Sequence, residues 1–142
     1  MVATTPASRK AKGRRFQQQL REDLITHLNI TPDDILSTAM GQGGCDLYLS
    51  PAARSVFPFG VEAKRAEALS IPAWWKQCES NASKVGLVPL LVFKRNREEP
   101  LAVLRWSDLI RLIREIRERC SGGRTSSRCC GRWQNSMHGE GW

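Results

Sequence analysis

Apolar residues at helical spacing predict three helices in this chain. The first follows from a four-residue repeat of apolar side chains, formed by Phe16, Leu20, Leu24 and Leu28. That repeat predicts a helix over about residues 8–28. A second helix is predicted over residues 72–84, because Pro72 suits the first turn of a helix. A third is predicted to begin at the N-cap residue Ser107, and its apolar stripe consists of Leu109, Ile110, Leu112, Ile113 and Ile116.

Short apolar runs bounded by turn residues predict five strands. They cover residues 35–40, 47–49, 57–64, 88–94 and 101–106. The glycine-rich segment 41–44 interrupts regular structure between the first two strands, and residues 96–100 form a predicted hairpin loop between the last two. The resulting order is α-β-β-β-α-β-β-α. This order predicts an α/β fold, in which helices flank a central mixed sheet of four or five strands in a single domain.

The two ends of the chain differ in composition from the middle. Residues 1–15 contain five basic side chains and no acidic one, which predicts a basic N-terminal arm that runs into the first helix. Residues 119–142 are rich in Gly, Ser, Arg and Cys and contain almost no aliphatic side chain, which predicts a flexible tail. Residues 16–118 are left as the predicted folded domain.

Charge and composition narrow the class of partner. The 142 residues carry 22 Lys and Arg against 14 Asp and Glu, a formal net charge of +8. This excess favours a polyanionic partner, with nucleic acid ahead of an anionic membrane surface. No apolar run is long enough to span a membrane. The sequence lacks a nucleotide-binding glycine motif, so no nucleotide cofactor is expected. The first residues lack the apolar core of a secretory signal and the cysteines number five, so a reducing cytoplasm is expected.

Three charged residues form the candidate chemical site. Glu62 and Lys64 share one face of the predicted strand 57–64, and Asp46 stands at the start of the preceding strand. If these strands pair, the two carboxylates converge and repel each other unless a cation lies between them. Oxygen ligands suit Mg²⁺ or Mn²⁺, and Lys64 is placed to stabilise charge on a phosphate. The alternative is a turn aspartate and a solvated strand face, but the apolar flanks of Glu62 favour the metal site.

The order of these motifs resembles the PD-(D/E)XK nuclease superfamily, which cuts DNA with the help of metal ions. An acid after a glycine-rich turn is followed by a hairpin and then by Glu-x-Lys. The likeness covers about residues 12–113 and extends to archaeal Holliday junction resolvases and to small phage-encoded members. The stretches that carry it are 12–16, 43–64, 74–77, 81–82 and 89–96.

The resemblance implies a restriction-endonuclease-like domain with defined site residues. It implies that Asp46, Glu62 and the backbone carbonyl of Ala63 bind Mg²⁺ or Mn²⁺. It also implies that Lys64 is catalytic and that Gln77 positions water or the carboxylates. The implied activity is DNA endonuclease on a branched substrate such as a Holliday junction, by a homodimer whose two sites make two cuts. For a phage-encoded protein the expected location is the host cytoplasm.

Two departures from the resemblance leave alternatives open. Gln17 stands where the archaeal resolvases carry a metal-site glutamate, and Glu22, one to two turns later, is a candidate to replace it. Cys45 stands where proline is common in the superfamily. The alternatives are therefore a repair or restriction-like nuclease that cuts ordinary duplex, and a non-catalytic nucleic-acid-binding protein on a degenerate nuclease scaffold.

Basic and glycine residues near the predicted site are the expected contacts with DNA. Cations neutralise phosphates and give salt-sensitive affinity, and glycines allow the backbone to approach closely. The predicted set is Arg9, Lys10, Lys12, Arg14, Arg15, Gly43, Gly44 and Arg65.

Overall fold

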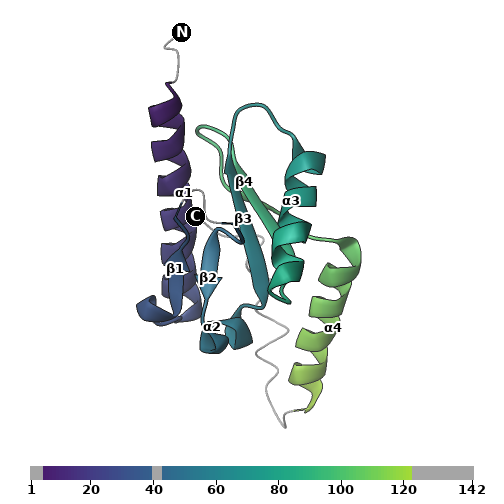
Figure 1. Cartoon of the computed structure of the whole chain (residues 1–142). Helices are drawn as coiled ribbons and strands as arrows, with labels where there is room; N and C mark the ends of the chain where they lie inside the picture. Colours follow the sequence, from purple (N-terminus) through teal and green to yellow (C-terminus); the bar gives the residue numbers. More distant parts are fainter. Residues whose placement is uncertain (1–4, 40–42, 123–142) are drawn as a thin grey trace. The chain divides into compact units, whose positions relative to one another are not determined.

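The computed structural model describes residues 5–39 and 43–122, and it divides the chain into two compact units (Figure 1). The first unit ends at Leu104 and the second begins at Arg105. The predicted end of the first strand at Met40 and most of the predicted tail lie outside the described residues. None of the described helices is long and apolar enough to cross a membrane.

Helix α1, Pro6–Leu28, begins and ends where local chemistry directs it. The Thr5 side chain accepts a hydrogen bond from the Ser8 N–H, and Pro6 occupies the first helical position. Asn29 ends the helix in the left-handed conformation, at φ 53°. The predicted helix is present, and it starts early enough that the basic residues of the predicted arm stand on its first turns.

Within the described residues, five strands form two sheets rather than one. Strands β1 (Ile35–Ser37) and β2 (Leu47–Leu49) are an antiparallel pair. Strands β3 (Phe59–Arg65), β4 (Val88–Lys94) and β5 (Leu101–Val103) form a second sheet in the order β3-β4-β5. In it β3 is parallel to β4, and β4 is antiparallel to β5 across the predicted hairpin loop.

The α/β class is confirmed, but the prediction of a single central sheet of four or five strands was wrong. The strand that contains Leu49 ends at once, because Ser50 caps a short helix, Pro51–Val56, with Pro51 in its first turn. This helix, α2, is not among the three that the apolar pattern predicts. Strand β2 is only three residues long. Among the described residues, one backbone hydrogen bond joins its leading end to β3, from the Asp46 N–H to the Val61 carbonyl at 2.9 Å.

Helices α1 and α3 cover opposite faces of β3 (Figure 1). On one face Val61 belongs to the apolar core with Phe16 and Leu20 of α1. On the other face α3, Ile71–Lys84, comes so close that a side chain at Gly60 would meet the Ala82 Cβ at 2.7 Å. This close approach lets short polar side chains of α3 reach residues on β3.

Helix α4, Trp106–Gly122, makes up the described part of the second unit. It begins at Trp106, so Ser107 lies inside the helix and is not its predicted cap. The predicted apolar stripe falls within this helix, and an Arg111–Asp108 ion pair of 3.0 Å spans its first turns.

Candidate active site

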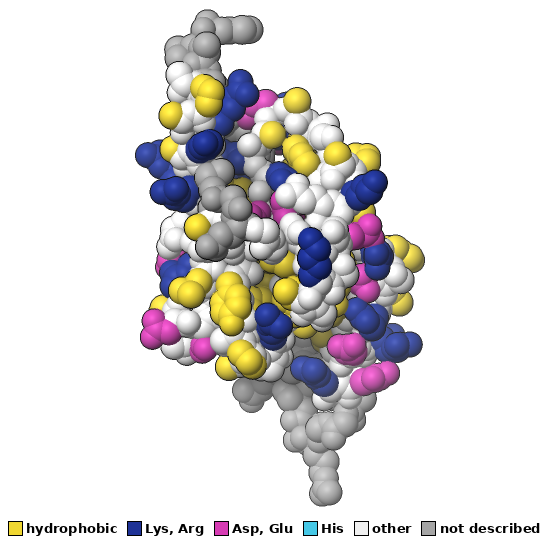
Figure 2. Space-filling model, in the orientation of Figure 1, with side chains coloured by type: hydrophobic (Ala, Val, Ile, Leu, Met, Phe, Trp, Pro, Cys, Tyr) yellow, Lys and Arg dark blue, Asp and Glu magenta, His cyan; other side chains and the backbone are white. Residues whose placement is uncertain are grey.

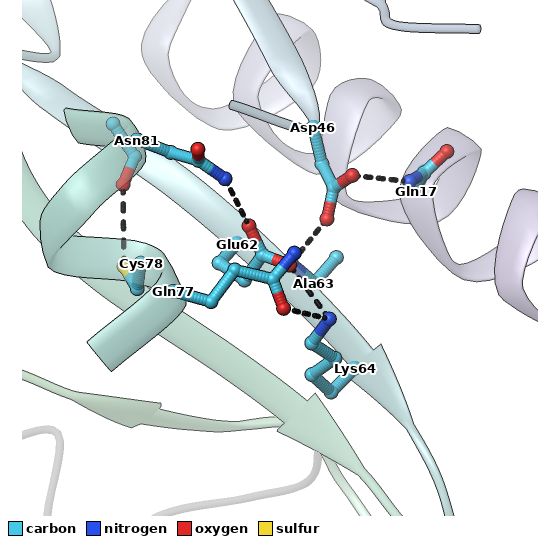
Figure 3. Close-up of polar contacts among 9 residues, drawn as sticks. Gln17, Asp46, Glu62, Ala63, Lys64, Gln77, Cys78 and Asn81 are labelled. Carbon is cyan, nitrogen blue, oxygen red and sulfur yellow. Dashed lines mark hydrogen bonds and ion pairs between the residues drawn. The ribbon is translucent and has the colours of Figure 1, made fainter. Parts of the chain in front are cut away.

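Asp46 is fixed at the junction of the two sheets. Its backbone N–H donates to the Val61 carbonyl of β3, and its carbonyl accepts from the Thr38 N–H, each at 2.9 Å. Its side chain accepts two further hydrogen bonds (Figure 3). Oδ2 accepts from the Ala63 N–H at 2.7 Å, and Oδ1 accepts from Gln17 Nε2 at 2.8 Å. The carboxylate is therefore held by neutral donors from β3 and α1.

The surroundings of Asp46 disfavour its charge. Burial raises the pKa of the Asp46 carboxyl from 3.8 to about 6, although the hydrogen bond from the Ala63 N–H opposes this. The neighbouring Glu62 carboxylate contributes to this rise in the pKa, while the Lys64 ammonium and the Gln17 amide oppose it. The donors within the protein thus leave part of the cost of the buried charge uncompensated. A cation bound beside Asp46 would compensate for the remaining cost of burying this charge.

Glu62 is the more deeply buried carboxylate, with 3% of its surface exposed. Its Oε1 forms an ion pair with Lys64 Nζ at 2.7 Å, and its Oε2 accepts from Asn81 Nδ2 at 3.2 Å. Lys64 Nζ also donates to Gln77 Oε1 at 2.9 Å. Gln77 and Asn81 are four residues apart on α3, so both project from one face of the helix toward β3 (Figure 3).

The backbone of Ala63 faces the same carboxylates. In a strand, the N–H and C=O of one residue point to the same edge. Because the Ala63 N–H reaches Asp46 on the edge of β3 away from β4, its carbonyl belongs to that edge too. This edge therefore presents two carboxylates and a backbone oxygen. Such a set of oxygen donors fits Mg²⁺ or Mn²⁺. Within residues 5–39 and 43–122, no cluster reaches three metal-binding acids, histidines or cysteines.

The structure brings Asp46, Glu62, Ala63, Lys64 and Gln77 together. Two further contacts come from residues that were absent from the predicted set. Gln17 contacts Asp46, and Asn81 contacts Glu62. The helical spacing of Asn81 from Gln77 was a signal available in the sequence. The resemblance to the resolvases pointed to position 17, but the contact of Gln17 with Asp46 itself depends on how α1 packs against β3.

Glu22 does not reach this site. Its carboxylate accepts from Gln18 Nε2 at 2.6 Å and pairs with Arg21 Nη1 at 2.7 Å. It is about half exposed on α1. Of the two candidates raised for the glutamate position of the resolvases, only Gln17 contacts a carboxylate of the site.

The thiol beside Asp46 is not an activated nucleophile. Burial raises the pKa of Cys45, and the Glu62 and Asp46 carboxylates raise it further. A thiol in such surroundings stays protonated. Its Sγ lies 2.9 Å from the position that a Cβ on Gly60 would occupy, so it fills space against β3.

The predicted DNA-contact residues occupy different parts of the first unit. Lys10, Arg14 and Arg15 are exposed on α1, where dark-blue side chains gather in Figure 2. Gly43 and Gly44 precede Asp46 in the loop, and Gly44 has a φ of 126° that favours glycine. The remaining members are Arg9, Lys12 and Arg65, which line one pocket away from the carboxylates.

This arrangement defines a class of protein. A strand carrying Glu-x-Lys is flanked by helices on both faces, and an aspartate from the preceding hairpin meets its edge, as in the PD-(D/E)XK nuclease superfamily. A family model described as phage putative PDDEXK endonuclease matches residues 8–128. The chain belongs to that family. No curated protein and no solved structure gives a significant match.

Proposed function

We propose that this protein is a metal-dependent endonuclease that hydrolyses phosphodiester bonds in DNA, using Mg²⁺ or Mn²⁺. The observation that carries the proposal is the meeting of Asp46, Glu62 and Lys64 at one edge of β3. Membership of a nuclease family supports the same reading of the site.

Each residue has a role that follows from its contacts. Asp46, Glu62 and the Ala63 carbonyl would hold the cation, which when bound supplies Lewis acidity and a water nucleophile at neutral pH. Lys64 holds its ammonium between Glu62 and Gln77, where it can stabilise negative charge that develops on the phosphate. Gln77 positions that ammonium. Asn81 fixes the second oxygen of Glu62.

The proposed substrate is branched DNA such as a Holliday junction. The net charge of +8 and the row of cations on α1 support binding to phosphates. The contacts proposed for this binding are Arg9, Lys10, Lys12, Arg14, Arg15, Gly43, Gly44 and Arg65. A homodimer is proposed because paired cuts in a junction need two sites, and two-fold pairs are the commonest assemblies.

The test compares a four-way junction, a linear duplex and single-stranded DNA as substrates, each with Mg²⁺, Mn²⁺ or EDTA. Wild type is expected to cut in the presence of metal, and Glu62→Ala and Lys64→Ala are expected to lose the activity. Glu98→Gln is the matched control, because Glu98 is a half-exposed acid in the β4–β5 loop. Paired symmetric cuts would support a dimeric resolvase, whereas preferential cutting of linear duplex would support a repair or restriction-like enzyme.

One observation favours a second candidate, a non-catalytic nucleic-acid-binding protein. Gln17 places a neutral amide on Asp46 Oδ1, which leaves the site with two acids and occupies one ligand oxygen. Binding of DNA by wild type without cutting under either metal would overturn the nuclease proposal and favour this candidate.

A further inference from the structure

A pocket of about 390 Å³ lies beside α1 and the end of β3, separate from the carboxylate site. Arg9 and Lys12 of α1 line it together with Arg65, the last residue of β3. Glu67 and Asn96 complete its polar wall. Three cations and one acid therefore line a hollow that is large enough to admit an anionic group such as a phosphate.

The only acid of this pocket wall is already engaged. Glu67 Oε1 accepts from the Asn96 backbone N–H at 2.7 Å. The Asn96 side-chain oxygen in turn accepts from Arg65 Nη2 at 3.2 Å. Thus Glu67 orders the loop after β4, and Asn96 orients the guanidinium. This is a supporting network that holds Arg65 in position rather than one that neutralises it.

The cations lack the acceptors that they need. Arg65 Nε is buried and has no hydrogen-bond partner in the described part of the chain. A buried donor on a charged group is costly when it remains unsatisfied. Over the same described ranges, no ion pair or side-chain hydrogen bond engages Arg9 or Lys12. The missing partner is an anion rich in acceptor oxygens, and a phosphate matches the fork of an arginine in geometry and charge.

The pocket also has a defined relation to the carboxylate site. Lys64 and Arg65 are consecutive on β3, so their side chains point to opposite faces, toward α3 and toward α1. On α1, Lys12 and Arg9 precede the Asp46-binding residue Gln17 by five and eight residues, or about 7.5 and 12 Å along the axis. One strand of duplex DNA carries a phosphate about every 3.4 Å of axis. For a strand that runs alongside α1, the pocket would therefore lie within about four phosphates of the carboxylates.

We infer that this pocket binds a phosphate of the cut strand other than the one that is hydrolysed. The identity of the strand rests on the proposed function, while the phosphate chemistry rests on the pocket itself. A phosphate held there fixes the strand along its length relative to Asp46 and Glu62. Arg65, held by Asn96, acts as the anchor, and Lys12 and Arg9 close the pocket from α1.

The experiment measures DNA binding by fluorescence anisotropy in EDTA at several salt concentrations. Arg65→Ala and Lys12→Ala are each expected to weaken binding about tenfold and to reduce the slope of log affinity against log salt by about one. Lys84→Ala removes the same charge from an exposed position on α3 and is the matched control. Because alanine is favourable within a helix, Lys12→Ala is expected to fold, so weaker binding by this variant is not explained by misfolding.

A scan of the DNA backbone identifies the bound group. Neutral methylphosphonates replace one phosphate at a time in the duplex that wild type binds best. Wild type is expected to lose affinity at a position near the cut, and Arg65→Ala is expected to be insensitive at that same position. Duplexes with a 5′-phosphate or a 5′-hydroxyl then distinguish an internal phosphodiester from a terminal phosphate.

The outcomes separate this inference from the proposed nuclease activity. If Arg65→Ala and Lys12→Ala bind like Lys84→Ala and the scan gives no shared position, the phosphate pocket is overturned even when wild type cuts DNA. If binding depends on Arg65 at one phosphate but no metal supports cutting, the pocket is supported and the nuclease proposal is overturned.

Discussion

The two carboxylates of the candidate site are held in different ways by the two helices that cover β3. On the α3 side, Glu62 is paired with the Lys64 ammonium and receives a hydrogen bond from Asn81. On the α1 side, Asp46 receives hydrogen bonds from the Gln17 amide and a backbone N–H, and no cationic side chain in the described part of the chain contacts it directly. Only the first carboxylate has its charge balanced by a direct partner from the protein.

This difference assigns separate roles to the two sides. The α3 side is complete without a ligand, because the charge of the buried Glu62 is matched by Lys64. The α1 side stays electrostatically costly, since burial raises the pKa of Asp46. A cation bound between the carboxylates relieves that cost. The comparison thus predicts that the α3 side contributes to stability, whereas the Asp46 charge is retained for ligand binding.

The largest expected effect is on the rate of DNA cleavage, which should fall by a similar factor when either carboxylate is replaced. Asp46→Asn and Glu62→Gln each remove a charged oxygen ligand with almost no change of shape. Each is expected to lower the cleavage rate at least about 100-fold, the scale of losing one strong electrostatic contact to a reacting group. The rate is measured on labelled DNA with Mg²⁺ or Mn²⁺, beside Glu98→Gln. Wild-type rates in either variant would remove that carboxylate from the site.

The second prediction separates the two sides by stability. Lys64→Met removes the ammonium and leaves the Glu62 carboxylate buried without its cation. The free energy of unfolding in EDTA is expected to fall by about 2–4 kcal/mol, as it does when one partner of a buried pair is lost. Urea unfolding measures it. The double variant Lys64→Met/Glu62→Gln should recover most of the loss, and a double variant as unstable as the single one would contradict a charge-based cause.

Sequence reasoning recovered what depends on local pattern. The alternation along β3 placed Glu62 and Lys64 on one face, and their ion pair bears this out. The positions of α1, α3 and β4 followed from apolar periodicity and proline placement. These features are set by neighbours within a few residues, which is the range over which hydrophobic spacing carries information.

The features that were not predicted depend on packing between distant segments or on local signals that fit two structures. Ser50 and Pro51 are typical of a turn after a strand, yet the same pair also serves as the cap and first turn of helix α2, which was not predicted. The contact of Gln17 with Asp46 joins residues that are 29 apart in sequence. No local pattern encodes such a contact, because it arises only when α1 packs on β3.

The third prediction tests the cost assigned to the α1 side. The pKa of Asp46 is raised in the folded protein, so the folded state binds more protons than the unfolded state between pH 3.8 and about 6. Stability therefore falls as the pH rises through this window and stays reduced above it. The shift corresponds to about 3 kcal/mol, which partial exposure to solvent lowers to about 1–2 kcal/mol.

Asp46→Asn should remove this cost. The asparagine oxygen can accept from the Ala63 N–H, and its amide can donate to Gln17 once that amide turns over. In EDTA at pH 8 the variant is expected to unfold at a higher urea concentration than wild type. At pH 4 the two should approach each other. A variant that is less stable than wild type at pH 8 would show that the hydrogen bonds outweigh the charge.

The smallest effect is expected when position 17 receives the glutamate that the resemblance to archaeal resolvases implies there. Gln17→Glu puts a carboxylate against Asp46 Oδ1 at a buried position of α1. A third negative charge should tighten Mn²⁺ binding about fivefold, since ligand charge sets affinity for hard cations. It should also lower the stability of the metal-free protein through like-charge repulsion.

Calorimetric titration with Mn²⁺ measures the change in metal affinity, and urea unfolding in EDTA measures the change in stability. The matched change Gln19→Glu, at an exposed position of the same helix, should change neither. Tighter metal binding with no loss of metal-free stability would mean that the new carboxylate turns away from Asp46 until the cation arrives, and unchanged affinity would place position 17 outside the metal's reach.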